Sequence, residues 1–344
     1  MLPLNNKLSS VGLRTMLMLA SLVIILSGIK AASQIVIPFL LALFLSIVLY
    51  PVVRFMARFR IPNVISVILI ALAIVIGFLA TASVVGSSLN DFTRTLPQYR
   101  GLIGEHLRDL QFYAAQLNIQ ISSEELMQYF DPALLVSFLT TMLSSFSGVM
   151  TNIFLLLMTV VFMLLEVQSL PHKLNKSLSN PVQGMISINN AINSISRYLA
   201  IKTVISIITG MIIWGFLSWI GVKYAMLWGV LGFMLNYIPN IGSFIAAVPP
   251  ILQALLFNGF ADGLAVLGCY IAVNLMIGNI IEPRIMGRGL GLSTLIVFLS
   301  LIFWGWLLGP VGMLLSVPLT IVAKIMLEAN PGSHRLAIML GDGK

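Results

Sequence analysis

The sequence predicts an all-α protein that crosses a membrane several times, and three observations carry this prediction. The chain of 344 residues is 59% hydrophobic and only 9% charged, and its mean hydropathy is +1.03. Apolar runs close to the roughly 20 residues that a helix needs to cross a bilayer recur along the chain. Two further apolar stretches, 224–257 and 292–327, are too long for one span and are interrupted by glycine and proline. We expect about seven to eight spans, counting these two broken segments.

The composition also excludes several classes of function. The net charge of +8 is typical of a membrane protein that retains lysine and arginine on its cytoplasmic side, and we expect no nucleic acid partner. The single cysteine, Cys269, excludes an internal disulfide framework. The three histidines are too scattered in the sequence to hold a metal ion. The sequence carries no nucleotide-binding motif and no catalytic constellation, so we expect neither an enzyme nor a cofactor.

Shifts in polarity divide the chain into five regions. These are an N-terminal three-span unit, an extracytoplasmic helical region, a fourth span with a cytoplasmic interfacial helix, a transport unit with two broken hairpin segments, and a cytoplasmic tail. Their expected boundaries are 1–86, 87–147, 148–200, 201–328 and 329–344.

The N-terminal unit sets the orientation of the whole chain. Arg54, Arg58 and Arg60 lie in a short loop between its second and third spans. Short loops rich in arginine stay in the cytoplasm, so this loop places both chain termini inside the cell. The spans of the unit are expected at about 11–29, 35–53 and 64–85.

The region 87–147 holds six of the eleven acidic residues and no apolar run long enough to span a membrane. Its apolar residues recur at helical spacing and predict an amphipathic helix: Leu96, Tyr99, Ile103, Leu107, Leu110 and Leu117. Ser122 to Glu125 is typical of a capping box, and Asp131-Pro132 of a further helix start. We expect a small helical domain that packs on the outer surface of the protein.

The region 148–200 combines the fourth span, expected at 149–165, with a second amphipathic helix. Asn180-Pro181 predicts the start of this helix, because proline is favoured at the first helical position. Apolar residues then line one face, and the helix runs into the fifth span at 199–220.

The number of times the chain crosses the membrane fixes the side on which each broken segment of the transport unit begins and ends. The span 263–281 must run from outside to inside, because it delivers Arg284 and Arg288 to the cytoplasm. The segment 224–257 therefore enters and leaves on the outer side, and 292–327 enters and leaves on the inner side. Each segment is either a pair of full spans or a re-entrant hairpin.

The breaks in the two segments resemble one another. The first reads Ile238-Pro-Asn-Ile-Gly242 and is followed by Pro249, and the second reads Gly309-Pro-Val-Gly312 and is followed by Pro318. Opposed segments with such breaks indicate an inverted repeat with a binding site near the bilayer midplane. Non-helical backbone persists at that depth only where protein or water satisfies its polar groups. The alternative is that glycine and proline form tight loops between ordinary spans.

Polar residues and backbone breakers near these segments are the candidates for a solute or ion path. Asn274, Gly278 and Glu282 have the i, i+4, i+8 spacing of one α-helical face, with the glycine as a helix–helix contact. Asn274 alternatively makes an interhelical hydrogen bond. The full set of candidates is Asn236, Pro239, Asn240, Gly242, Gln253, Asn274, Gly278, Asn279, Glu282, Arg284, Arg288, Pro310 and Gly312.

The stretch 279–291 concentrates an acid, two arginines, a proline and three glycines between two apolar runs. Pro283 has no N–H, so we expect the helix to end or kink at Glu282, with Arg284 or Arg288 beside the exposed carbonyls or paired with the carboxylate. Two interpretations remain open. Glu282 couples movement to an ion gradient through its protonation or pairing, or it forms a fixed Glu–Arg clasp that only locks the loop.

Three stretches give the sequence a family resemblance. They read Leu235-Asn-Tyr-Ile-Pro-Asn-Ile-Gly-Ser243, Gly278-Asn-Ile-Ile-Glu-Pro-Arg-Ile-Met-Gly287 and Phe303-Trp-Gly-Trp-Leu-Leu-Gly-Pro-Val-Gly-Met313. They resemble the autoinducer-2 exporter family of bacterial membrane proteins, and the likeness covers nearly the whole chain. The resemblance implies a multi-pass inner-membrane transporter that exports autoinducer-2. It also implies a homo-oligomer, a pentamer, with an elevator-like movement of the hairpin-bearing unit.

Three functional hypotheses follow. The first is a secondary transporter for a small polar solute, embedded in the lipid bilayer and coupled to a proton or sodium ion. The second is a sodium or potassium/proton antiporter with Glu282 or Asp262 as the titrating acid, an activity that the resemblance also implies for some relatives. The third is a membrane scaffold without transport activity, whose region 87–147 recruits partners.

Overall fold

The computed structural model describes residues 5–116, 153–166, 173, 181–239, 241–286, 292–329, 332 and 334–341. All regular structure within these ranges is helical, which confirms the prediction of an all-α polytopic membrane protein. Five helical stretches in them are long and apolar enough to cross a membrane: Ser33–Arg58, Asn63–Ser88, Gly184–Ile220, Phe260–Ile285 and Thr294–Leu314. The predicted capping box and the helix start at Asp131 lie outside the described residues.

The N-terminal helices are α1 (Asn5–Ala31), α2 (Ser33–Arg58) and α3 (Asn63–Gln116). Near its end, α1 approaches the C-terminal half of the chain, where Lys30 Nζ lies 4.3 Å from the centroid of the Trp306 ring, a cation–π distance. The helices α2 and α3 pack with α6 (Ile153–Glu166) through one apolar cluster: Ala42, Val53, Val67, Ile70, Val160 and Leu164.

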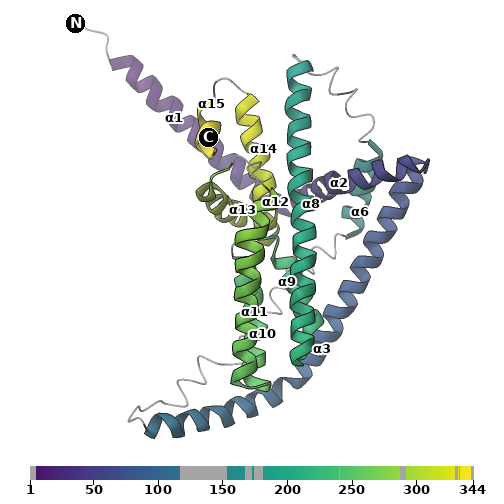
Figure 1. Ribbon diagram of the computed structural model, residues 1–344. Coiled ribbons are helices and arrows are strands. Elements are labelled where there is room, and N and C mark those ends of the chain that lie inside the picture. Colours follow the sequence, from purple (N-terminus) through teal and green to yellow (C-terminus); the bar gives the residue numbers. More distant parts are fainter. Residues whose placement is uncertain are drawn as a thin grey trace.

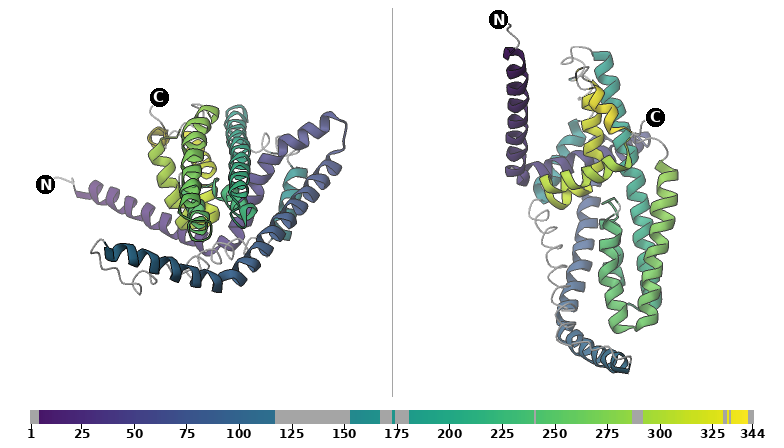
Figure 2. Two further views of the ribbon diagram at one scale, coloured as in Figure 1. Left: turned by 60° about the horizontal axis from the view of Figure 1, so that its bottom comes forward. Right: turned by 90° about the vertical axis from the view of Figure 1, so that its left-hand side faces the viewer.

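The third span and the amphipathic helix that follows it form one continuous helix, α3, of 54 residues. The apolar part of this helix, Asn63–Ser88, agrees with the third span expected at about 64–85. The amphipathic stretch that was expected after it continues the same helix, and neither Gly86 nor Pro97 ends it. The ribbon bends along its length, and its last part lies apart from the other helices (Figures 1 and 2).

The helix α8 (Pro181–Ile220) is the longest element of the C-terminal half. It starts at the predicted proline and continues through the fifth span without interruption. Its 40 residues correspond to about 60 Å at 1.5 Å per residue. Figure 1 shows it running through the molecule beside both broken segments.

The first broken segment forms a hairpin of α9 (Ala225–Leu235) and α10 (Gly242–Phe257). The 11 residues of α9 extend about 16 Å, about half the thickness of a bilayer core, so this segment is a hairpin and not two full spans. It packs with α11 (Phe260–Val273) against the last turns of α8, where the core includes Ile213 and Leu217.

The second broken segment forms a hairpin of α13 (Thr294–Leu314) and α14 (Ser316–Ala329), followed by α15 (His334–Leu340). The backbone leaves helical geometry at Gly309, with φ 65°, a conformation that glycine adopts without the strain of a side chain. This hairpin packs against earlier turns of α8, around Ile195 and Leu199. The two hairpins therefore occupy different parts of the same long helix (Figure 1).

Both breaks contain a glycine in the same backbone setting. A Cβ atom on Gly242 would lie 1.8 Å from the carbonyl oxygen of Leu235, and one on Gly312 would lie 1.9 Å from that of Trp304. The side chain four residues earlier is the next close contact in both, at Ile238 and Leu308 respectively. This shared geometry supports the internal similarity that the sequence of the two breaks predicts.

The segment before Glu282 is wound as a π-helix, η1 (Asn274–Ile281), and continues into α12 (Glu282–Met286). The helix therefore does not end at Glu282, which corrects that part of the prediction. In an α-helix the ring of Pro283 clashes with the carbonyl four residues earlier. The wider π turns shift the carbonyls by one position, which explains how the helix continues past the proline.

The predicted contact of Gly278 can be checked against the structure. The i, i+4, i+8 spacing of Asn274, Gly278 and Glu282 keeps them near one face of the helix. Gly278 is exposed, and nothing in the described chain lies within 4 Å of a Cβ placed on it. The prediction that this glycine makes a helix–helix contact within the chain is therefore wrong.

Candidate functional site

A buried polar stripe runs along the middle of α8. Lys202, Ser206 and Thr209 are at most 3% exposed and follow the i, i+4, i+7 spacing that places side chains on one helical face. They lie between the two apolar clusters through which α8 contacts the hairpins, since Leu199 belongs to one cluster and Ile213 to the other. Buried polar side chains are costly in a membrane protein, and they usually face protein or a solute path.

The stripe includes one member of a buried ion pair. Lys202 Nζ lies 2.6 Å from Glu282 Oε1, and the two side chains are 4% and 18% exposed. Eighty positions separate the partners in sequence, so the pair joins α8 to α12. A charge removed from water is tolerated when an opposite charge compensates it. Among the described residues the ion-pair partner of Glu282 is therefore Lys202 and not Arg284, whereas Arg288 lies outside them.

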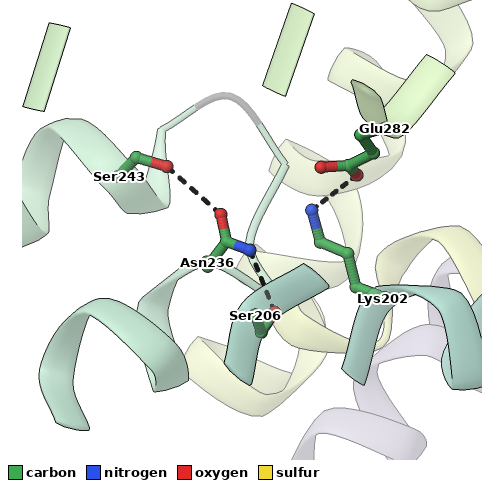
Figure 3. A network of polar contacts seen from close by, with 5 residues as sticks. All are labelled: Lys202, Ser206, Asn236, Ser243 and Glu282. Atoms are coloured by element: carbon green, nitrogen blue, oxygen red, sulfur yellow. Dashed lines mark hydrogen bonds and ion pairs between the residues drawn. The ribbon is translucent and has the colours of Figure 1, made fainter. Parts of the chain in front are cut away.

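The first break contributes Asn236 to the same network (Figure 3). Its Nδ2 donates to Ser206 Oγ at 2.9 Å, and its Oδ1 accepts from Ser243 Oγ at 3.4 Å. The amide therefore connects the end of α9, the first turn of α10 and the stripe on α8. In Figure 3 these bonds lie beside the Lys202–Glu282 pair, so the two polar contacts form one site.

A second contact holds the same break against α8. Tyr237 Oη donates to Thr203 Oγ1 at 2.7 Å, and Thr203 Oγ1 donates to the carbonyl of Leu199 at 2.7 Å. Both side chains are only partly buried. Two consecutive residues of the break, Asn236 and Tyr237, are thus anchored to two turns of one helix.

The second break has a different polar partner. Trp304 Nε1 donates to Thr320 Oγ1 at 3.0 Å, and that hydroxyl donates to the carbonyl of Ser316 at 2.7 Å. These bonds join α13 to α14 and stay within the hairpin. Pro310 is exposed and Gly312 is buried at this break, so these two candidates contribute backbone shape to the fold of the hairpin.

The remaining candidates lie at varied distances from the network. Pro239 and Gly242 form the first break itself, whereas Gln253 accepts a 2.6 Å hydrogen bond from Trp228 inside the core of the first hairpin. Asn274 is half-buried, and Asn279 and Arg284 are exposed with Gly278. Asn240 and Arg288 are outside the described residues. Asn236 and Glu282 are thus the predicted polar residues that the structure brings together.

Sequence reasoning missed the whole contribution of α8. Lys202, Thr203, Ser206 and Thr209 were not singled out, because α8 resembles an ordinary span with a lysine near its start, and Tyr237 of the first break was not singled out either. The signal that identifies them is a lysine followed by hydroxyl residues at four and seven positions, on one face of an apolar helix. Within the described part of the chain no cluster of metal-binding side chains is found, and the network instead offers hydroxyl, amide, ammonium and carboxylate groups.

Two broken hairpins packed along one long helix, the first of them bonded to a buried polar network, are typical of a membrane transport protein. The comparisons with known proteins agree with this class and give the family. The profile described as "AI-2E family transporter" matches residues 19–332. The chain therefore belongs to the AI-2E transporter family.

Relatives are similar to this chain over nearly their full length. The AI-2 transport protein TqsA of Escherichia coli K12 is 53% identical over 331 residues, which cover 96% of each chain. The protein YhhT of the same strain, named provisionally as a transport protein, is 45% identical over 97% of this chain and 95% of its own. A protein of Haemophilus influenzae with the same provisional description is 43% identical over 96% of each chain. These are transport proteins and not enzymes, which confirms the prediction of a transporter.

Proposed function

We propose that this chain is a secondary transporter that exports autoinducer-2 across the bacterial inner membrane. The observation that carries the proposal is the buried network of Lys202, Ser206, Asn236 and Glu282, at the point where α8 meets the first hairpin and α12. A polar site at this place in an apolar protein is what a solute needs on its way through a membrane. The substrate is inferred from TqsA, which is named as an AI-2 transport protein.

The proposed mechanism is alternating access with an elevator-like movement. The transport unit, 201–328, carries both hairpins, and both chain termini lie in the cytoplasm. Each hairpin approaches the site from a different end of α8, so that moving one unit relative to the others exposes the site to one side at a time. We further propose a homo-oligomer, a pentamer, in which each protomer carries its own site.

Transport into liposomes tests the function directly. Purified protein is reconstituted, and movement of autoinducer-2 is measured with and without a proton or a sodium gradient. The proposal expects saturable movement of autoinducer-2 that one of the gradients accelerates. Sodium-driven proton flux without movement of autoinducer-2 contradicts it and supports cation/proton antiport instead.

The antiport alternative has one observation in its favour, the buried pair of Lys202 and Glu282. Protonation of the carboxylate removes its charge and with it the attraction to the ammonium group, so a cation and a proton compete for one acid. The other acid considered, Asp262, lies in the first turn of α11, about 30 Å along the helix from Glu282. Glu282 is therefore the acid that both the exporter and the antiporter mechanisms use.

The scaffold alternative has no comparable observation, and membership of a transporter family argues against it.

The variant Glu282→Gln separates a coupling role from a fixed clasp. A coupling role predicts normal abundance in the membrane together with lost transport or a lost pH dependence, because glutamine cannot titrate. A clasp predicts a less stable protein whose residual transport keeps its pH dependence. The second pattern excludes Glu282 as the coupling residue and leaves the transport function standing.

A further inference from the structure

We propose that Ser206, Thr209 and Asn236 form a subsite for a small uncharged solute that carries several hydroxyl groups, next to the Lys202–Glu282 pair. The inference rests on the proposed transport function and goes beyond it, because it assigns the chemistry of the ligand and the residues that recognise it. Ser206 and Thr209 are contributed by α8, and Asn236 by the first break.

The unusual state of Thr209 is the first observation behind this subsite. Buried threonines in helices commonly donate to the carbonyl four residues earlier, as Thr203 and Thr320 do here. Thr209 is 2% exposed, and its Oγ1 has no hydrogen-bond partner in the described part of the chain. A buried hydroxyl without a partner is unfavourable, so a ligand that bonds to it offsets the cost of burying that hydroxyl.

The second observation is the balance of charge in the network. Lys202 and Glu282 neutralise each other at 2.6 Å. A cation that approaches the carboxylate meets the ammonium group, and an anion that approaches the ammonium group meets the carboxylate. A neutral hydroxyl group both donates and accepts, so it bonds to either member without separating the pair. The network therefore favours a neutral hydroxylated solute over a free ion while the pair is intact.

The third observation is a weak bond that a solute can replace. Ser243 Oγ lies 3.4 Å from Asn236 Oδ1, near the upper limit of a hydrogen bond, whereas Asn236 Nδ2 lies 2.9 Å from Ser206 Oγ. Gly242 holds this geometry, because its lack of a side chain lets the start of α10 contact the Leu235 carbonyl. A solute hydroxyl at the acceptor side of Asn236 replaces a long contact with a shorter one.

The test measures transport of several probes by reconstituted full-length protein. The probes are autoinducer-2, glycerol, erythritol, lactate and sodium, and each unlabelled probe also competes with labelled autoinducer-2. The proposal expects saturable transport of neutral hydroxylated probes and competition among them. It expects no competition from lactate or sodium. Ser206→Ala and Thr209→Val should each raise the half-saturation concentration about tenfold, the effect of one lost hydrogen bond in a dry site, with a smaller change in the maximal rate.

Two variants that lose a buried hydroxyl outside the proposed subsite serve as controls. Ser46→Ala removes an unpartnered buried hydroxyl from α2, and Ser300→Ala removes one that donates to the Val297 carbonyl within α13. Both should keep the half-saturation concentration of the wild type. Thermal unfolding of every variant shows whether the protein folds, and stabilisation of the folded protein by erythritol reports binding without transport.

The possible outcomes distinguish failure of the proposed subsite from failure of the proposed transport function. Export of autoinducer-2 with unchanged half-saturation in Ser206→Ala and Thr209→Val overturns the subsite and leaves the proposed function intact. Saturable transport of lactate or sodium, with no transport or binding of any neutral hydroxylated probe, overturns both. A rise in the half-saturation concentration in the two site variants but not in the two controls supports the subsite.

Discussion

The two hairpin breaks share a backbone device and differ in their polar contacts. Gly242 and Gly312 both lie so close to a backbone carbonyl before the break that a Cβ would lie within 2 Å of its oxygen. The first break is tied to α8 through Asn236 and Tyr237, whereas the tryptophan–threonine bond beside the second stays inside its own hairpin. The two tips thus share a backbone geometry, and the side-chain hydrogen bonds to α8 that the described residues show at the breaks are those of the first.

The same comparison assigns different roles to the two breaks: side chains that can bind a solute at the first, and backbone shape at the second. The first break offers side-chain donors and acceptors beside a buried ion pair (Figure 3). The second contributes the kink at Gly309 and an apolar contact with α8. We infer that the first break recognises the solute, while the second completes the barrier on the opposite side.

The largest expected effect is an all-or-none difference in accessibility between the two hairpins. In a Cys269→Ala background, cysteine replaces either Lys223, exposed before the first hairpin, or Glu328, exposed at the end of the second. A membrane-impermeant maleimide added to intact cells should label position 223 and should label position 328 only after permeabilisation. Labelling of both positions in intact cells contradicts the opposed entry of the hairpins.

The next effect concerns the two glycines. Gly242→Ala and Gly312→Ala should each destabilise the protein by about 3 kcal/mol, because the added methyl group overlaps backbone that cannot move aside. Gly278→Ala is the control, since the structure leaves its Cβ position free within the chain. Thermal unfolding in detergent measures the difference. Equal stability of all three variants shows that the tips do not share this geometry.

Much of the fold could be predicted from the sequence because glycine and proline mark both breaks in otherwise apolar runs. Asn236 and Glu282 could be predicted for the same reason, since polar residues beside such breaks are conspicuous. Lys202 and the hydroxyls of α8 could not, because their importance depends on which helix packs against them. The π turns of η1 could not be predicted from the spacing of the apolar residues, and the exposure of Gly278 depends on which helices pack against its face.

A smaller effect concerns the ion pair between α8 and α12 that lies beside the first break. Lys202→Met leaves Glu282 without its partner and should destabilise the protein by roughly 2–3 kcal/mol, below the range for fully buried pairs because the carboxylate is 18% exposed. Combining Lys202→Met with Glu282→Leu removes both charges and should restore most of this loss. Unfolding of the wild type, Lys202→Met, Glu282→Leu and the double variant measures the interaction as a double-mutant cycle. Additive losses in the double variant show that the two side chains do not stabilise each other.

The smallest expected effect concerns two threonines, each of which accepts a hydrogen bond from an aromatic side chain near one of the breaks. Thr203→Val and Thr320→Val remove the partners of Tyr237 and Trp304, and each should cost about 1 kcal/mol of stability. Only Thr203→Val should also slow transport, because it loosens the break that carries Asn236. Equal transport rates in the two variants remove the functional distinction between the hairpins.

The central claim is that the buried network of Lys202, Ser206, Asn236 and Glu282 is needed for transport of the solute and does not merely stabilise the fold. Transport of autoinducer-2 by the Lys202→Met/Glu282→Leu variant in liposomes tests it most directly, because unfolding measurements establish beforehand that this variant is folded. Our account predicts a stable protein with transport reduced at least tenfold relative to wild type, the loss expected from removing one charged interaction. A stable double variant that transports autoinducer-2 at the wild-type rate would contradict it.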